Sequence, residues 1–480
     1  MRFAVLLFSV VCCTATDLEH RIDSLAESSG PRSITGSGFA GIHVVELATG
    51  KTIYHLNENR LFLPASNMKL FTTALALLRL GPDRRFTTQV VLTAAGDLVL
   101  AGVGDPSLSG RAFPYQKDAA PGRALKPIED LADQIVANGI RHIDGDVVGD
   151  DRLYPWAPYA PSWTEDDTVR DFGAPVSALS VNENAIAITL HAGERPGDPA
   201  ELTLDPPLEY YVIDQRVATV ARGGEAKIRI ARQAGSRQIL LWGSIPAGHA
   251  AIAETTAIDD PALYAACALY DALTRRGISV GGRPVARHRA ATDDYEAPDG
   301  TVVASRTSPP LLQLLETMEK VSQNLFAELM LRETGRVMRH QATREAGLEE
   351  LNALLTEIGA TKEESRLEDG SGLSRNTLVT PRLVTRLLAF LNGTKYRDDW
   401  LSLLPVGGED GTLANRLCCV SEGRGIHAKT GSLSRALALS GYADSKTRGR
   451  LAFSILVNDF SAPPSEVRAW IDKIASALLE

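Results

Sequence analysis

The stretch "LPASNMKLFTTALALLRLGPD" (residues 63–83) places a serine and a lysine at the start of an apolar helix. Gly81-Pro82 supplies a stop signal, so the sequence predicts a helix that ends there. Ser66 and Lys69 are one helical turn apart and therefore lie on the same side. A serine at a helix start is by default a cap, so a catalytic role requires partners elsewhere in the chain. The apolar residues recur at helical spacing: Leu70, Ala74, Leu77 and Leu78.

The Ser66–Lys69 pair has the chemistry of a nucleophile and a base. Ser66 must lose a proton near neutral pH, and Lys69 can take it if burial or a neighbouring cation destabilises the ammonium form. The N–H groups at a helix start favour the negative charge that develops on the serine. This is the only S-x-x-K sequence in the chain.

A second motif, "EKVSQNLFAEL", places Ser322 and Asn324 at a predicted junction between two helices. The hydroxyl would relay a proton to a leaving amine, and the amide would orient Lys69 and a substrate carbonyl. The alternative for Ser322 is a cap of the helix that begins near Asn324.

A third motif, "HAKTGSL", places Lys429, Thr430 and Gly431 on a predicted strand. The cation and the hydroxyl suit a terminal carboxylate, and the glycine lets a peptide approach the strand edge. The backbone N–H groups of Ser66 and Ser432 would form an oxyanion hole. The alternative for this motif is a solvated turn.

The order of the predicted elements indicates one α/β domain interrupted by an insertion. Residues 38–63 alternate like a hairpin, and residues 86–304 contain short strands separated by Gly, Pro and Asp. After Arg306 helices dominate, and the chain ends in three strands and a helix. We therefore expect residues 16–85 and 305–480 to form one discontinuous domain and residues 86–304 to be inserted after the Ser66 helix.

Composition excludes several classes of protein. Apolar residues make up 44% and charged residues 23% of the 480 residues, as in soluble globular proteins of two or three domains. The formal net charge of −9 provides no basic field, so nucleic acid is not an expected partner.

The first residues, "MRFAVLLFSVVCCTA", have the charged start, apolar run and small residues of a secretory signal peptide. The run is too short for a membrane span, so we expect cleavage near residue 15 and a periplasmic or wall-associated protein. Cys12 and Cys13 leave a lipoprotein as the alternative, which the residues before them disfavour. Without a C-x-x-C pair or a His-rich cluster, no metal, cofactor or disulfide framework is expected. The other cysteines are Cys267, Cys418 and Cys419.

Taken together, the motifs S-x-x-K, S-x-N and K-T-G, in this order and on these elements, resemble those of the penicillin-recognising serine enzymes. The long interval between Lys69 and Ser322 is similar to that of the low-molecular-mass class C group, the penicillin-binding-protein-4 type D-alanyl-D-alanine carboxypeptidases and endopeptidases. Further segments share the resemblance: "GVGDPSL" (102–108), "APVSALSVNEN" (174–184), "DGSGLSR" (369–375) and "LPVGGEDGTL" (404–413).

The resemblance implies an α/β (α+β) penicillin-binding domain, an antiparallel sheet flanked by helices, with two strand-rich accessory domains inserted. It implies peptidoglycan stem peptides as substrates, an acyl-Ser66 intermediate, and β-lactams as covalent inhibitors. The segment "SWTEDDTVRDFGAP" resembles a stretch whose acidic residue binds the side-chain amine of the stem peptide, which makes Asp166 and Asp167 candidates. Their alternative is a solvated loop. "DGSGLSR" would shape the wall of the site.

Two other functions compete with this one. A β-lactamase is disfavoured by the large insertion and by the lack of an E-x-x-L-N segment between Ser322 and Lys429, with Glu409 as the reserve candidate for activating water. A catalytically silent, wall-binding scaffold has no chemical reason to keep all of Ser66, Lys69, Ser322, Asn324 and Lys429. The sequence leaves open the oligomeric state, the preferred stem-peptide residue, and the balance of carboxypeptidase and endopeptidase activity.

Overall fold

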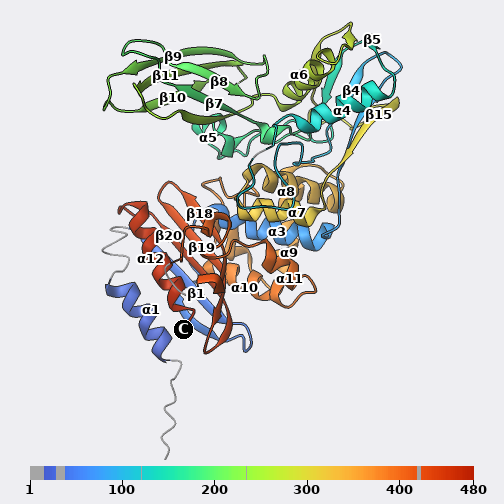
Figure 1. Ribbon diagram of the computed structural model, residues 1–480. Coiled ribbons are helices and arrows are strands. Elements are labelled where there is room, and N and C mark those ends of the chain that lie inside the picture. Colours follow the sequence, from blue (N-terminus) through green and yellow to red (C-terminus); the bar gives the residue numbers. More distant parts are fainter. Residues whose placement is uncertain (1–15, 29–37, 121, 234, 419–422) are drawn as a thin grey trace, which may run out of the picture.

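The computed structural model describes residues 16–28, 38–120, 122–233, 235–418 and 423–480 (Figure 1). The predicted signal peptide, with Cys12 and Cys13, lies outside these residues, as does Cys419. The fold is a mixed α/β fold with several sheets, so the predicted fold class is confirmed. In the described part of the chain, no helix combines the length and the apolar character needed to cross a membrane.

A five-stranded antiparallel sheet joins the two ends of the chain. Its order is β18-β19-β20-β1-β2, so the first strand pairs with the last one and β18 is an edge strand. The middle strands are buried along almost their whole length because helices cover both faces. The strands are β1 (Phe39–Glu46), β2 (Thr52–Leu56), β18 (Ile426–Leu433), β19 (Ala436–Ser445) and β20 (Gly449–Asn458).

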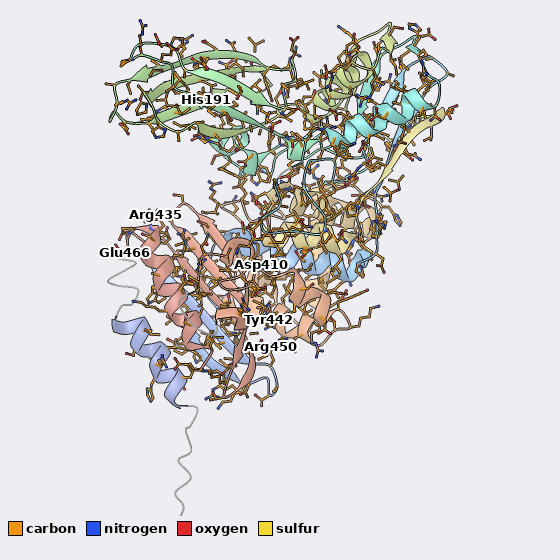
Figure 2. All side chains as sticks on the ribbon, viewed as in Figure 1. His191, Asp410, Arg435, Tyr442, Arg450 and Glu466 are labelled. Atoms are coloured by element: carbon orange, nitrogen blue, oxygen red, sulfur yellow. The ribbon has the colours of Figure 1, made fainter. Side chains whose placement is uncertain are left out.

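Two groups of helices cover this sheet (Figure 1). One face packs against α12 (Pro464–Ala477) and α1 (Thr16–Ser28), around buried residues such as Trp470 and Ile455. The other face packs against a larger bundle, and there Tyr442 of β19 receives a 3.0 Å hydrogen bond from Trp400 (Figure 2). The bundle comprises α3 (Met68–Leu80), α7 (Leu311–Lys320), α8 (Asn324–Arg339), α9 (Arg344–Glu357), α10 (Pro381–Asn392) and α11 (Arg397–Leu403).

The chain leaves the bundle through β3 (Thr87–Leu92) and returns through β15 (Thr301–Thr307), and these two strands pair antiparallel. They belong to a second five-stranded sheet, β14-β6-β4-β3-β15, on which α4 (Lys126–Ala137) and α6 (Pro261–Thr274) pack. The remaining strands of this sheet are β4 (Leu98–Ala101), β6 (Val147–Asp150) and β14 (Pro284–Arg287).

Two three-stranded sheets complete the segment between β3 and β15 (Figure 1). One is β12-β7-β8, and the other is β10-β11-β9, in which β9 and β11 run parallel. Short helix α5 (Glu165–Val169) lies between these sheets and the helical bundle. The strands are β7 (Ala185–His191), β8 (Glu201–Asp205), β9 (Val212–Val220), β10 (Lys227–Arg232), β11 (Gln238–Pro246) and β12 (Ile252–Ala257). In the same segment, the two-residue strands β5 (His142–Ile143) and β13 (Ser279–Val280) pair with each other. A second two-residue pair, β16 (Ser365–Arg366) with β17 (Leu378–Val379), lies outside this segment, between α9 and α10 in the chain.

Candidate active site

Ser66 lies in a 3₁₀ turn, η1 (Ala65–Asn67), directly before α3. The default reading as a helix cap is wrong, because the capping position of α3 is Asn67 and no side chain caps the helix. Instead, Asn67 donates from Nδ2 to the backbone oxygen of Lys429 at 2.9 Å and so ties the turn to β18. The Ser66 hydroxyl is left available for other interactions.

Lys69 is completely buried on the first turn of α3, and its ammonium nitrogen has three partners. Nζ lies 3.1 Å from Ser66 Oγ, 2.6 Å from Asn324 Oδ1 and 2.9 Å from the backbone oxygen of Ser371. Burial, together with the nearby Lys429 ammonium, lowers the pKa of Lys69 to about 7. A substantial fraction of Lys69 is therefore neutral near neutral pH.

The three partners determine where the lone pair of neutral Lys69 points. The Ser371 carbonyl oxygen and Asn324 Oδ1 can only accept hydrogen bonds, so they take the two N–H bonds of the neutral amine. The lone pair is then directed at Ser66 Oγ, whose hydroxyl can donate to it. This is the arrangement that a general base needs before it removes a proton from a nucleophile.

A second lysine–serine pair lies across the same site. Lys429, also completely buried, donates from Nζ to Ser322 Oγ at 2.8 Å and to the Thr430 carbonyl at 3.1 Å. Burial lowers the pKa of Lys429 to about 8. Ser322 follows α7 with a φ of 63°, and Gln323 rather than Ser322 caps α8 by accepting from the Leu325 N–H. Backbone strain of this kind is common at functional sites.

A cleft of about 520 Å³ opens onto these groups, and we call it the catalytic cleft. Ser66, Ser322, Asn324 and Ser432 line it directly, whereas the two lysines lie behind its wall. The structure thus brings the predicted serines, the asparagine and both lysines together, although 255 positions separate Lys69 from Asn324 in the chain.

The segment 369–375 forms one wall and also holds the base. Glu328 accepts the backbone N–H groups of Gly370 and Ser371 at 2.9 and 2.8 Å, which fixes the carbonyl that Lys69 contacts. Gly372 has a φ of 79°, and a Cβ there would lie 1.9 Å from the Ala65 carbonyl oxygen. Only glycine therefore lets this segment lie against the turn that carries Ser66.

Glu319 on α7 is a buried carboxylate that the motifs did not indicate. It is completely buried, and Oε1 accepts from the Thr73 hydroxyl at 2.5 Å, one turn along α3 from Lys69. Oε2 has no hydrogen-bond partner among the described residues. Burial raises the pKa of Glu319, whereas the charges of Lys429 and Lys69 lower it. One signal in the sequence could have identified Glu319: it is a charged residue four positions after Leu315 and therefore falls on the apolar face of its helix.

The segment between β3 and β15 contributes another wall of the catalytic cleft. The Phe172 carbonyl accepts from Asn324 Nδ2 at 2.7 Å, which fixes the amide so that its oxygen faces Lys69. Asp167 lines the cleft, but its carboxylate is already paired with Arg375 and accepts from the backbone N–H of Thr164. Asp166 is exposed and does not line the cleft.

Residues of the K-T-G motif have local partners. Thr430 Oγ1 donates to Thr412 Oγ1 at 2.8 Å. A Cβ on Gly431 would lie 2.5 Å from the Pro64 carbonyl oxygen. The sequence predicted that Gly431 lets a peptide approach the strand edge, and this reason needs correction. Position 431 has no space for a side chain because η1 packs against it. The reserve candidate for activating water, Glu409, does not line the cleft; it is exposed and lies 3.4 Å from Arg424.

Comparison with known proteins gives consistent matches. The model of the D-Ala-D-Ala carboxypeptidase 3 (S13) family matches residues 19–478. A D-alanyl-D-alanine carboxypeptidase of Actinomadura sp. (strain R39) is 33% identical over 97% of this chain and 85% of that protein. The D-alanyl-D-alanine carboxypeptidase DacB of Haemophilus influenzae is 25% identical over 84% of this chain and 82% of its own length. The crystal structure of penicillin binding protein 4 (dacB) from Haemophilus influenzae superimposes with a TM-score of 0.82 at 22% identity, covering 96% and 99% of the two chains.

Proposed function

The chain belongs to the D-Ala-D-Ala carboxypeptidase 3 (S13) family, and from this premise we propose that its serine-type peptidase activity proceeds through an acyl-enzyme on Ser66. The substrates are peptidoglycan stem peptides that end in D-Ala-D-Ala, and β-lactams acylate the same serine. One observation carries the assignment: Ser66 Oγ lies 3.1 Å from a buried Lys69 whose other two partners can only accept hydrogen bonds.

Acylation begins when neutral Lys69 removes the proton of Ser66 as Oγ attacks the carbonyl of the penultimate D-alanine. The backbone N–H groups of Ser66 and Ser432, which both line the catalytic cleft, stabilise the oxyanion. A base near its own pKa is efficient at neutral pH, and the lowered pKa of Lys69 meets this condition.

Breakdown of the tetrahedral intermediate requires a proton on the departing amine. Ser322 donates its hydroxyl proton to the amine nitrogen, and Lys429, 2.8 Å from Ser322 Oγ, replaces that proton from its ammonium group. Lys429 therefore acts in its charged form and Lys69 in its neutral form. After the released D-alanine has diffused away, water attacks the acyl ester and its proton passes through Ser322 to the now neutral Lys429. Lys69 returns its proton to Ser66 Oγ as the ester bond breaks, which restores both lysines to their starting states.

A β-lactam has no amine fragment that departs, because the opened ring stays attached and obstructs the path of water. A β-lactamase overcomes this obstruction with a carboxylate that activates water. The reserve candidate for that role, Glu409, is exposed and pairs with Arg424. We therefore propose a penicillin-sensitive carboxypeptidase and not a β-lactamase.

We propose further that residues 16–85 and 305–480 form the catalytic domain and that residues 86–304 form an inserted region. The pairing of β3 with β15 supports this division because the chain leaves and returns at one place. Within the inserted region, Asp167 is the candidate for recognition of a stem-peptide amine, and its pairing with Arg375 means that such an amine must compete with a guanidinium. Export through a signal peptide, cleaved near residue 15, would bring the enzyme to its substrate.

The test of this proposal is steady-state hydrolysis of a D-Ala-D-Ala peptide by the wild-type protein and by Ser66→Ala and Lys69→Met. We expect no hydrolysis by Ser66→Ala, and acylation by Lys69→Met to be slower by about 10²- to 10⁴-fold, with peptide binding little changed. Retained hydrolysis in Ser66→Ala, with an unchanged melting temperature, would refute Ser66 as the nucleophile. An unchanged acylation rate in Lys69→Met would assign the base elsewhere.

A further inference from the structure

The middle residue of the S-x-N motif, Gln323, contacts the segment between β3 and β15, and the mechanism gives this contact no role. Gln323 Oε1 accepts the Leu325 N–H at 2.9 Å and so caps α8. Its Nε2 donates to Oε2 of Glu183, which lies in the turn η3 (Asn182–Asn184) directly before β7. Both polar ends of the amide are therefore occupied, one by its own helix and one by a distant part of the chain.

Arg111 holds the Glu183 carboxylate from another direction. Nε of Arg111 donates to Oε1, and Nη2 donates to Oε2 at 2.8 Å, so the guanidinium contacts both oxygens. Only 14% of the Glu183 side chain is exposed. A carboxylate can only accept hydrogen bonds, so it selects the NH2 end of the Gln323 amide and leaves the amide oxygen for the cap. Glu183 thereby fixes which way the amide of Gln323 faces.

The backbone that carries Glu183 is strained. Asn182, Glu183 and Asn184 have φ angles of 51°, 56° and 53°, a left-handed conformation that asparagine tolerates and that is uncommon for glutamate. Asn184 is completely buried and holds the turn, because it accepts from the Val181 N–H at 3.1 Å and donates to the Pro175 carbonyl at 2.9 Å. The chain thus maintains an unfavourable conformation at the residue that contacts the S-x-N motif, and strain of this kind is common at functional sites.

We propose that Glu183 is a positioning residue, which holds the S-x-N junction in its working geometry through Gln323. The inference rests on the proposed function, because it takes Ser322 and Asn324 as the groups that act beside Ser66. Neither Glu183 nor Gln323 lines the catalytic cleft. The pair therefore acts on the rate of the chemical step and not on the binding of substrate.

Two contacts of the active site depend on this junction. Ser322 Oγ lies 2.8 Å from Lys429 Nζ. Asn324 Oδ1 lies 2.6 Å from Lys69 Nζ. Rotation of the backbone between Ser322 and Asn324 would displace both contacts together, and a displacement of about 1 Å can cost about 100-fold in rate. Loss of the Glu183 contact should therefore slow acylation while the noncovalent affinity for a penicillin is kept.

Penicillin acylation, resolved into the dissociation constant of the noncovalent complex and the acylation rate constant, tests the proposal. Gln323→Glu keeps an oxygen that caps α8 but sets a second carboxylate against Glu183, so the acylation rate constant should fall about 10- to 100-fold. Glu183→Ala should show a fall of the same order. The exchanged pair, Glu183→Gln with Gln323→Glu, again has one donor facing one acceptor and should recover most of the loss. The dissociation constant should be unchanged in all three proteins.

Asp214→Asn is the matched control, because Asp214 also pairs with an arginine through both oxygens, on β9, and does not line the cleft. Its acylation rate constant should equal that of the wild type. If the new charge of Gln323→Glu acted only on Lys69, the acid limb of the pH profile would move and the maximal rate would stay intact. That result would overturn the positioning role, as would an unchanged rate constant in Glu183→Ala or an exchanged pair that recovers nothing. These outcomes overturn the inference alone, whereas a wild-type protein that no penicillin acylates would refute the proposed function and the inference with it.

Discussion

At the scale of single residues, two lysines share the buried side of the catalytic cleft, and one carboxylate balances part of their charge. Glu319 raises the pKa of both Lys69 and Lys429, against the burial that lowers them. Glu328 and Asp369 are the other acids that act on Lys69. In the mechanism that we propose, Lys69 acts in its neutral form and Lys429 in its charged form, so these buried acids influence the pH range in which both conditions hold.

The first prediction concerns the pH dependence of acylation. The rate should rise as pH increases through about 7, where Lys69 loses its proton, and fall above about 8, where Lys429 loses its own. Glu319→Gln removes a negative charge that stabilises both ammonium groups, so both limbs of the profile should move to lower pH. The measurement is the rate of penicillin acylation across the pH range.

Glu316→Gln is the matched control, because Glu316 lies on the same helix and is not among the principal causes of the pKa shift of either lysine. Its profile should coincide with that of the wild type. A Glu319→Gln profile that keeps both limbs in place, in a protein with normal stability, would show that this carboxylate does not act on the lysines.

The sequence was sufficient to find the residues to which we assign the chemistry, but not the groups that position their side chains. Ser66, Lys69, Ser322, Asn324 and Lys429 stand in spaced motifs, whereas two partners in the site are backbone carbonyls, of Ser371 and Phe172. A carbonyl is present at every residue, so no pattern identifies one. The roles of the five motif residues stay predictions until they are tested by substitution.

At the scale of elements, the site is built where a short 3₁₀ turn, an edge strand and a glycine-rich segment meet. Gly372 and Gly431 both face the turn η1, and neither leaves space for a Cβ. The sequence predicted the hairpin, the Ser66 helix and the three terminal strands, because their apolar periodicity is regular. It did not predict β9 (Val212–Val220), whose polar residues and parallel pairing with β11 give no such pattern.

The second prediction separates the cost of backbone strain from the cost of a clash. Gly372→Ala places a methyl group 1.9 Å from the Ala65 carbonyl, so it should lower the melting temperature and slow penicillin acylation of Ser66. Gly359→Ala is the control: its φ of 80° matches the 79° of Gly372, but nothing lies within 4 Å. The control should lose only about 1–2 kcal/mol and acylate normally. Equal acylation rates in the two variants would contradict the packing argument.

At the scale of the whole molecule, the segment between β3 and β15 contributes to the candidate active site. It supplies the Phe172 carbonyl to Asn324, and its Trp163 donates from Nε1 to Asp369 Oδ2 at 3.1 Å. Trp163 is only 8% exposed and belongs to the same apolar cluster as the helical bundle. Loss of packing around Trp163 should therefore disturb the segment 369–375 and, through it, the position of Lys69.

The third prediction follows from this contact. Trp163→Ala should cost about 3–5 kcal/mol of stability and slow acylation of Ser66, although Trp163 does not line the catalytic cleft. Trp242→Ala, at an exposed position on β11, should change stability by about 0.5 kcal/mol or less and leave acylation unchanged. Thermal unfolding and penicillin labelling of both variants provide the measurement. Normal acylation in a folded Trp163→Ala protein would show that the segment between β3 and β15 does not influence Lys69.

The most direct test of the central claim is the identity of the residue that a penicillin acylates. The wild-type protein is incubated with a fluorescent penicillin, digested, and the labelled peptide is mapped by mass spectrometry. We predict one label per chain, on Ser66 in the peptide that contains "PASNMK", with a stoichiometric burst and very slow release, and no label in Ser66→Ala. A label on another residue, or rapid and sustained β-lactam hydrolysis with negligible cleavage of a D-Ala-D-Ala peptide, would contradict the account.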